Sequence, residues 1–89
     1  MTKTDVDKIV GEALSVSRED VTYITQYFLD TILEEMLNGE SVNLRGFGVF
    51  SCKTTKDRNG WDGLKGEPIR IKGRRLPRFN FSATLKEKF

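Results

Sequence analysis

Nine lysine and arginine side chains lie between Lys53 and Arg78, close enough together to bind a polyanion. Arg70, Lys72 and Arg74 are spaced two residues apart, which would place them on one face of a β-strand. A cationic stripe of this kind can follow a phosphate path or enter a narrow groove of a nucleic acid. The alternative is a solvated strand face that deters edge-to-edge aggregation. Five cations in the nine residues from Arg70 to Arg78 favour binding.

Catalytic chemistry has no comparable support in the sequence. The chain has no histidine, and its one cysteine, Cys52, lies in an alternating strand pattern without an identifiable basic partner. No carboxylate cluster has metal-ligand spacing, and the glycine-rich segment 59–66 lacks the Lys-Ser/Thr ending of a phosphate-binding loop. We therefore expect no enzyme, no metal, no cofactor and no small-molecule substrate.

The charge of the chain is unevenly distributed. The 89 residues carry a formal net charge of +2, but residues 1–45 hold four basic and nine acidic side chains, whereas residues 46–89 hold eleven and four. A basic half of this kind indicates a nucleic-acid or membrane-surface partner. No stretch resembles an export signal or is long enough to span a bilayer, so we expect no membrane anchor. The lone cysteine suits a reducing compartment, and the expected location is the cytoplasm.

The elements that must position these cations are two strand-like limbs. An alternating strand begins at Val42 and is followed by a Gly46-Phe47-Gly48 turn and a second strand. Sheet and arm together are expected over residues 40–79, with the arm at about 53–75. The sequence Leu76-Pro77 is expected to end the returning strand, because proline donates no ladder hydrogen bond. A ribbon with so little apolar surface should project from the body of the protein.

The first 38 residues are expected to form a helical base. Thr2 and Ser17 each stand three residues before an aspartate, a pattern typical of helix starts. The first helix carries one apolar stripe between Val6 and Leu14, and the second should run from about Arg18 to Leu37. A third, short helix capped by Ser82 is expected within residues 82–89.

The second helix has a wider apolar arc than a surface helix needs, so it should bury two faces, one of them against a partner subunit. Tyr23 and Tyr27 border that arc and are expected to be packing residues rather than a ligand site. The chain is a single small domain of 89 residues, and a projecting ribbon leaves it a thin core. Dimerisation is the expected remedy.

The order of these features resembles the bacterial nucleoid-associated HU and integration host factor family, with matching spacing along essentially the whole chain. The matching residues are Lys3-Thr4, Gly39, Leu44-Arg45-Gly46-Phe47-Gly48-Val49-Phe50, Gly60, Gly66-Glu67, Ile71, Pro77, Phe79 and Leu85-Lys86. The resemblance implies an α+β fold. Two amino-terminal helices would precede a three-stranded antiparallel sheet with a long protruding β-ribbon arm and a short carboxy-terminal helix. It also implies an intertwined dimer, either a homodimer or a heterodimer with a paralogue.

The resemblance further implies a partner, double-stranded DNA of the nucleoid, and a mode of binding. In the family the arms lie in the minor groove, and an apolar wedge near each tip bends the duplex. Low sequence specificity would follow, since the minor groove is largely blind to base identity. Lys3 and Lys86 fall where the family often contacts flanking phosphates, and Arg45 resembles the integration host factor version of the turn. The expected DNA-binding residues are Lys3, Arg45, Lys53, Lys56, Arg58, Trp61, Lys65, Arg70, Lys72, Arg74, Arg75 and Lys86.

The sequence departs from the family at the arm tip. Where the family has Arg-Asn-Pro, with proline as the wedge, this chain has Trp61-Asp62-Gly63. Trp61 is the natural substitute because an indole can stack on bases, and Leu64 is a second candidate. The competing interpretation is that Trp61 folds back onto the ribbon. The missing proline also leaves open an RNA-binding or protein-binding adaptor that keeps the fold without bending DNA.

Overall fold

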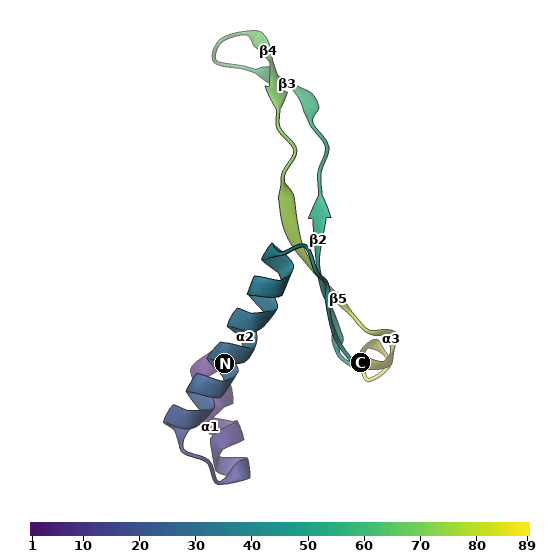
Figure 1. Ribbon diagram of the computed structural model, residues 1–89. Helices are drawn as coiled ribbons and strands as arrows, with labels where there is room; N and C mark the ends of the chain where they lie inside the picture. Colours follow the sequence, from purple (N-terminus) through teal and green to yellow (C-terminus); the bar gives the residue numbers. More distant parts are fainter. The chain divides into compact units, whose positions relative to one another are not determined.

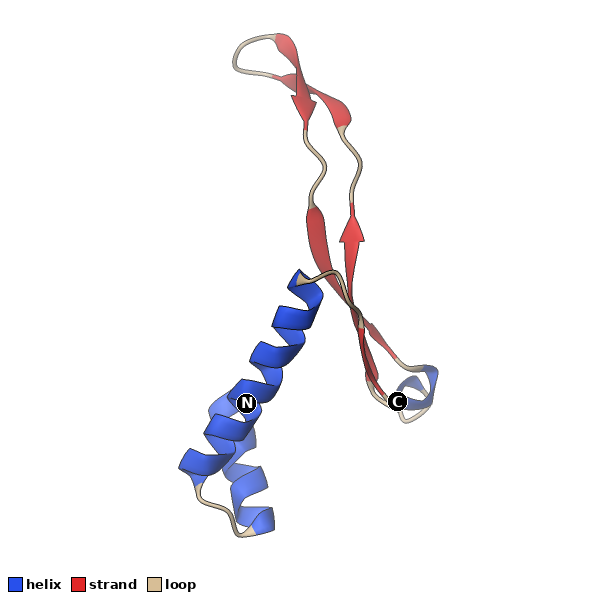
Figure 2. Ribbon diagram, in the orientation of Figure 1, coloured by secondary structure: helices blue, strands red, loops and turns tan.

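The computed structural model describes all 89 residues, which form two compact units, residues 1–35 and residues 36–89. The element order matches the predicted α+β arrangement of two helices, antiparallel strands and a short last helix (Figures 1 and 2). The elements are α1 (Lys3–Leu14), α2 (Arg18–Leu37), β1 (Val42–Leu44), β2 (Gly48–Thr54), β3 (Arg58–Asp62), β4 (Glu67–Ile71), β5 (Arg75–Phe81) and α3 (Ala83–Lys86).

Local capping sets the helix boundaries. At the start of α1, the Thr2 Oγ1 accepts a hydrogen bond from the Asp5 N–H, and the Asp5 carboxylate accepts one from the Thr2 N–H at 2.9 Å. Ser17 accepts from the Asp20 N–H at 3.2 Å and so starts α2. Beyond α2, Gly39 adopts φ +86°, which a residue with a side chain rarely adopts. The predicted helix starts are confirmed.

The buried face of α1 differs from the predicted apolar stripe. Val6, Ile9 and Leu14 are exposed, whereas Asp7 and Gly11 are buried. Gly11 is buried because the backbone at Val16 approaches it closely. A Cβ on residue 11 would lie 2.8 Å from the Val16 carbonyl oxygen. A glycine therefore lets the loop after α1 pass directly against the helix.

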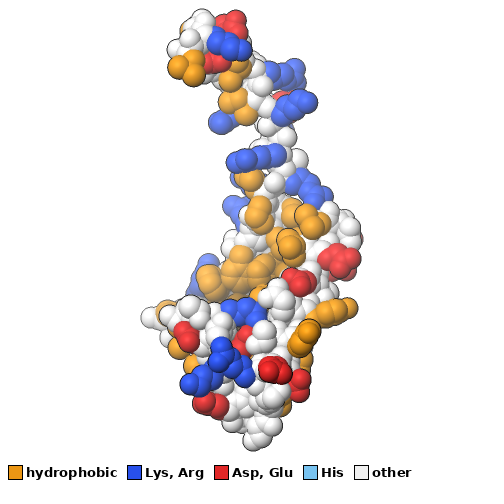
Figure 3. All heavy atoms as spheres, turned by 90° about the vertical axis from the view of Figure 1, so that its left-hand side faces the viewer, with side chains coloured by type: hydrophobic (Ala, Val, Ile, Leu, Met, Phe, Trp, Pro, Cys, Tyr) orange, Lys and Arg blue, Asp and Glu red, His pale blue; other side chains and the backbone are white.

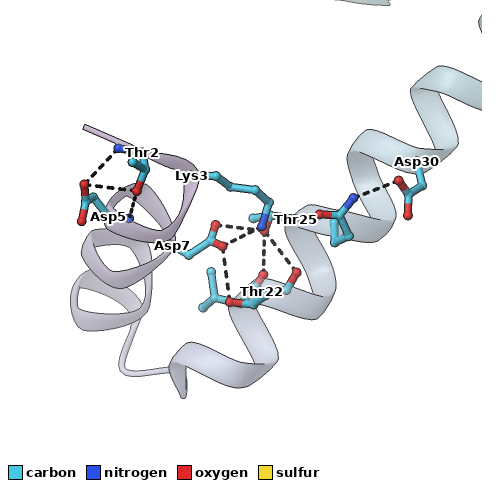
Figure 4. A network of polar contacts seen from close by, with 9 residues as sticks. Thr2, Lys3, Asp5, Asp7, Thr22, Thr25 and Asp30 are labelled. Carbon is cyan, nitrogen blue, oxygen red and sulfur yellow. Dashed lines mark hydrogen bonds and ion pairs between the residues drawn. The ribbon is translucent and has the colours of Figure 1, made fainter.

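Asp7 is the centre of a polar cluster between α1 and α2 in the first unit (Figure 4). Its side chain is only 2% exposed, and Lys3 Nζ lies 2.7 Å from its Oδ2. Thr25 Oγ1 donates to Oδ1 at 2.9 Å, and Thr22 Oγ1 donates to Oδ2 at 3.3 Å. The hydrogen bond from Lys3 is the main cause that holds the pKa of Asp7 below its ordinary value of 3.8, against the opposing effect of burial.

We expect Asp7→Asn to lower the thermal unfolding midpoint at pH 7 by roughly 5–10 °C, because the amide loses the ion pair and cannot accept all three bonds. The Asp7 pKa is depressed in the folded state, so its contribution is present above about pH 4 and is lost as the pH falls below that value. The difference in unfolding midpoint between the parent protein and Asp7→Asn should therefore be smaller at pH 2 than at pH 7. Circular dichroism melts measure it, with the exposed Glu12→Gln as control; an equal gap at both pH values contradicts the assignment.

The second helix leaves much of its apolar surface uncovered in the single chain. Val21, Ile32 and Met36 are buried, but five other apolar side chains are between 44% and 65% exposed. Those five are Ile24, Phe28, Leu29, Leu33 and Leu37. Tyr23 and Tyr27 are 80% and 77% exposed in the single chain. The prediction that they are packing residues therefore stays a prediction for the face that would meet a partner subunit.

Within residues 36–89, the strands β1, β2 and β5 form an antiparallel sheet in that order. The strand β5 continues through Pro77, which pairs with Cys52, so the prediction that Leu76-Pro77 ends the strand is wrong. The physical reason is the position of β5 at the edge of the sheet. An edge strand carries ladder bonds on one side only, and a proline is tolerated there.

Four phenylalanines form an aromatic cluster at the turn between β1 and β2 in this unit. Phe79 lies at the centre, with ring centroids 4.5 Å from Phe50, 4.8 Å from Phe81 and 6.0 Å from Phe47. A Cβ on Gly48 would clash with the Phe79 ring and the Asn80 carbonyl, so only glycine fits beneath that ring. The predicted turn between the two strands is confirmed.

Candidate nucleic-acid interface

The second unit carries a long hairpin, which we call the arm (residues 53–75), that extends away from the three-stranded sheet (Figures 1 and 2). Pairing of β2 with β5 runs from Gly48 and Phe81 to Thr54 and Arg75. It then stops, and β3 pairs with β4 as a separate two-stranded sheet. The arm is therefore divided by what we call the joint, residues 55–57 and 72–74, which belong to no strand.

Lysine and arginine side chains follow the arm along much of its length (Figure 3). Only one of them is within ion-pair distance of a carboxylate: Arg70 Nη2 lies 3.2 Å from Asp57 Oδ2. Arg75 is occupied differently, since its Nη2 donates at 2.7 Å to the Leu37 carbonyl at the end of α2. The other cations of the arm have no acidic partner in the chain, which leaves them available to an external anion.

The predicted stripe of Arg70, Lys72 and Arg74 on one strand face is wrong. The strand β4 ends at Ile71 and β5 begins at Arg75, so Lys72 and Arg74 lie in the joint, where side chains no longer alternate as in a strand. Arg70 faces Asp57, whereas Lys72 and Arg74 line a hollow together with cations of the opposite limb. The interruption of the ladder is the physical reason for the difference.

This hollow has a volume of about 400 Å³ and combines four cations with an apolar floor. It is lined by Thr55, Lys56, Arg58, Ile71, Lys72, Arg74 and Leu76. None of the four cations has a carboxylate within ion-pair distance, so no acidic side chain of the protein neutralises them. A phosphate group of a nucleic-acid backbone has the charge and the acceptor oxygens that such a hollow selects.

The turn at the tip of the arm is shorter than the glycine-rich segment 59–66. The strand β3 continues to Asp62, and only residues 63–66 form the turn. Asp62 Oδ1 accepts hydrogen bonds from the Leu64 and Lys65 N–H groups at 2.9 and 3.2 Å, and the Asp62 carbonyl accepts one from Gly66. The carboxylate therefore builds the turn, a role that the turn-starting preference of aspartate could have indicated.

Trp61 does not fold back into a core. It lies in β3 opposite Pro68, and its side chain is 67% exposed. Cross-strand pairing places Trp61 and Arg70 on the same face of the distal hairpin (residues 58–71). Leu64 is fully exposed in the turn. Both candidate wedge residues are thus accessible, one on the strand and one at the apex.

The remaining predicted binding residues are dispersed. Lys3 belongs to the first unit and is paired with Asp7. Arg45 lies in the turn before β2, and Lys86 ends α3. Lys53 lies in β2 at the base of the arm, and Lys65 lies in the tip turn. Of the predicted set, the structure brings together Lys56, Arg58, Lys72 and Arg74.

Two other classes of site have no counterpart in the structure. No three side chains of the kinds that ligate metals gather in one place. No helix combines the length and the apolar content needed to cross a bilayer.

Comparison with known proteins identifies the same family along the full chain. Residues 1–89 match the family described as bacterial DNA-binding protein. DNA-binding protein HU 1 of Bacillus subtilis is 34% identical over 87 residues, which cover 98% of this chain and 95% of that protein. Integration host factor subunit alpha of Caulobacter vibrioides is 34% identical over 86 residues, covering 97% of this chain and 86% of the relative.

Solved structures of the same kind share the fold. An Anabaena HU–DNA cocrystal structure superposes with a TM-score of 0.86 at 31% identity, covering 99% of this chain and 96% of that one. A structure of HU from Thermotoga maritima gives a TM-score of 0.68 at 26% identity, with 99% and 97% coverage. This chain therefore shares its fold with these HU structures over nearly its whole length.

Proposed function

Since the chain belongs to the bacterial DNA-binding protein family that contains HU and integration host factor, we propose that it is an architectural protein that binds duplex DNA and bends it. The observation that carries this proposal is the arm, where four cations without acidic partners surround one hollow. The likeness to an HU chain solved with DNA supports the same partner.

The arm cations would bind the phosphate backbone and release its condensed counterions. Because these contacts go to phosphates and because the minor groove presents a degenerate pattern, sequence preference should be low. Selection would instead favour DNA that is already bent or easily deformed. Arg58 and Arg74, on opposite limbs, are the side chains that we expect to contribute most, since arginine binds phosphate through two parallel hydrogen bonds.

Bending requires an apolar side chain that unstacks a base step. We assign this role to Trp61, whose indole is exposed on the distal hairpin, with Leu64 as the alternative at the apex. The hydrogen bonds that Asp62 makes to the turn would hold both side chains in place. The carboxylate itself is engaged with backbone N–H groups, which moderates its repulsion of phosphates.

Two arms are needed to embrace a duplex, so the proposal includes a dimer. The five exposed apolar side chains of α2 offer the surface for it, because a monomer would leave them in water. A second copy of the chain is the simplest partner, and a paralogue is the alternative. Paired helices would also compensate for the thin core of each small chain.

Other function classes have weaker support. An adaptor that binds RNA or protein would leave the cation-lined hollow and the DNA-bound relative unexplained. Catalysis would require a nucleophile, base or metal site, and the named relatives are DNA-binding proteins. We therefore propose a non-catalytic protein that acts on the DNA of the nucleoid.

A gel-shift comparison of linear, nicked and pre-bent duplexes at two salt concentrations tests the function. We expect tighter binding to nicked and pre-bent DNA and a log-linear loss of affinity with salt, as counterion release requires. Mass photometry of the same complexes should give two chains per bound site. An affinity that does not change between low and moderate salt would rule out the electrostatic mechanism, and preference for RNA or for no nucleic acid would favour the adaptor.

A further inference from the structure

We propose that Asp57 is a positioning residue that sets the direction of the distal hairpin and, through it, the angle by which DNA is bent. The effect on DNA rests on the proposed function, whereas the effect on the arm does not. Asp57 is an acidic residue in the middle of a basic arm, where its charge opposes polyanion binding. Its contacts in the joint give a physical reason for its presence.

The Asp57 carboxylate bridges the two limbs where the strand ladder is interrupted. Its Oδ1 accepts a hydrogen bond from the Gly73 N–H at 2.6 Å, across the hairpin. Its Oδ2 accepts one from Arg70 Nη2 at 3.2 Å. The contact to Gly73 is the more important one, because both partners of the Arg70 ion pair are well exposed and such pairs stabilise little.

Thr55 supplies a second set of bonds across the joint. Its N–H donates to the Arg74 carbonyl at 2.9 Å, and its Oγ1 accepts from the Arg74 N–H at 2.9 Å. A Cβ on residue 73 would collide with the Thr55 carbonyl oxygen, so Gly73 is required for this approach. The joint is thus a defined structure in which one backbone bond and two side-chain oxygens connect the limbs in place of a regular ladder.

A defined joint has two consequences for the interface. It opens the hollow, whose cations Lys56, Lys72 and Arg74 lie on or beside the bonded residues. It also fixes how the distal hairpin, with Trp61, continues from the base of the arm, because no strand pairing links the two sheets there. Loss of the Asp57 bond should therefore loosen the tip without removing a cation.

Three variants of the full chain separate positioning from charge. Asp57→Ala removes both the charge and the acceptor, whereas Asp57→Asn removes the charge and keeps an oxygen for the Gly73 N–H. Glu67→Gln, at a side chain of the arm that forms no hydrogen bond or ion pair, removes the same charge elsewhere and is the matched control. All three remove one negative charge from the arm and should therefore bind DNA slightly tighter.

Only Asp57→Ala should change the geometry. We expect the Gly73 amide of the free protein to exchange with solvent at least about tenfold faster in this variant. We also expect a smaller bend, measured by fluorescence energy transfer between the ends of a short duplex. Asp57→Asn should keep the Gly73 amide protected from exchange and should bend DNA as the parent protein does. The conservative variant would thus rescue both properties that Asp57→Ala loses.

The outcomes distinguish the inference from the proposed function. Unchanged Gly73 exchange in Asp57→Ala, or a bend equal to that of Glu67→Gln, overturns the positioning role while DNA binding stands. Equal loss of bending in Asp57→Asn also overturns it, because charge would then be the cause. If the parent protein does not bind duplex DNA, the proposed function fails, and the exchange experiment still decides whether Asp57 orders the joint.

Discussion

Replacing Lys56, Arg58, Lys72 and Arg74 together by glutamine should weaken duplex binding by about 10³-fold at 0.1 M salt and reduce the slope of log affinity against log salt by about 3.6. These four cations line the hollow and have no acidic partner in the chain. Each phosphate contact that is lost leaves its condensed counterions on the DNA, so the favourable entropy of their release is lost as well. Fluorescence anisotropy of a labelled duplex between 50 and 300 mM salt measures both quantities.

A matched pair of double variants shows whether position or net charge is responsible. Lys72→Gln with Arg74→Gln removes two charges from the hollow, and Lys8→Gln with Arg18→Gln removes two from residues 1–35. The first should lower the salt slope by about 1.8, and the second should leave it nearly unchanged. Equal losses in the two variants would mean that the hollow has no special role and that only overall charge matters.

Trp61→Ala should abolish most of the DNA bending while reducing affinity by only about fivefold. The indole is exposed on the β3–β4 hairpin, so it can enter a base step without first leaving a core. Stacking on a base contributes roughly 1–3 kcal/mol, part of which offsets the cost of unstacking the step. Energy transfer between duplex ends reports the bend, and quenching of the single tryptophan of the parent protein reports the contact.

Leu64→Ala is the control for this experiment. Leu64 is fully exposed, and its removal keeps the fluorescent probe. We expect this variant to bend DNA almost as the parent does and to show the same quenching. If Leu64→Ala loses bending and Trp61→Ala keeps it, the apex of the turn is the wedge and the indole only shields the strand.

Features that depend on neighbouring residues could be predicted from the sequence. The caps at Thr2 and Ser17, the span of α2, the turn at Gly46 and the cap of the last helix at Ser82 all agree with the structure. In each case a side chain satisfies a backbone group a few residues away, or a glycine permits a local conformation. The charge asymmetry and the order of elements are likewise properties of the chain alone.

Features that depend on contacts across the fold could not be predicted. The role of Asp7 requires Thr22 and Thr25 from another helix, and the tolerance of Pro77 requires that β5 be an edge strand. The prediction that Arg70, Lys72 and Arg74 share one strand face was wrong, because it assumed that side chains alternate regularly through the joint.

The sequence by itself thus determined the family, the helices and the presence of a basic arm in this protein. Only the tertiary structure decided which cations converge and which are occupied, as Arg70 is by Asp57 and Arg75 is by the end of α2. The physical reason is range. Caps, turns and charge are set by residues close together in the chain, whereas the joint depends on bonds between limbs that are 16 to 19 residues apart in sequence.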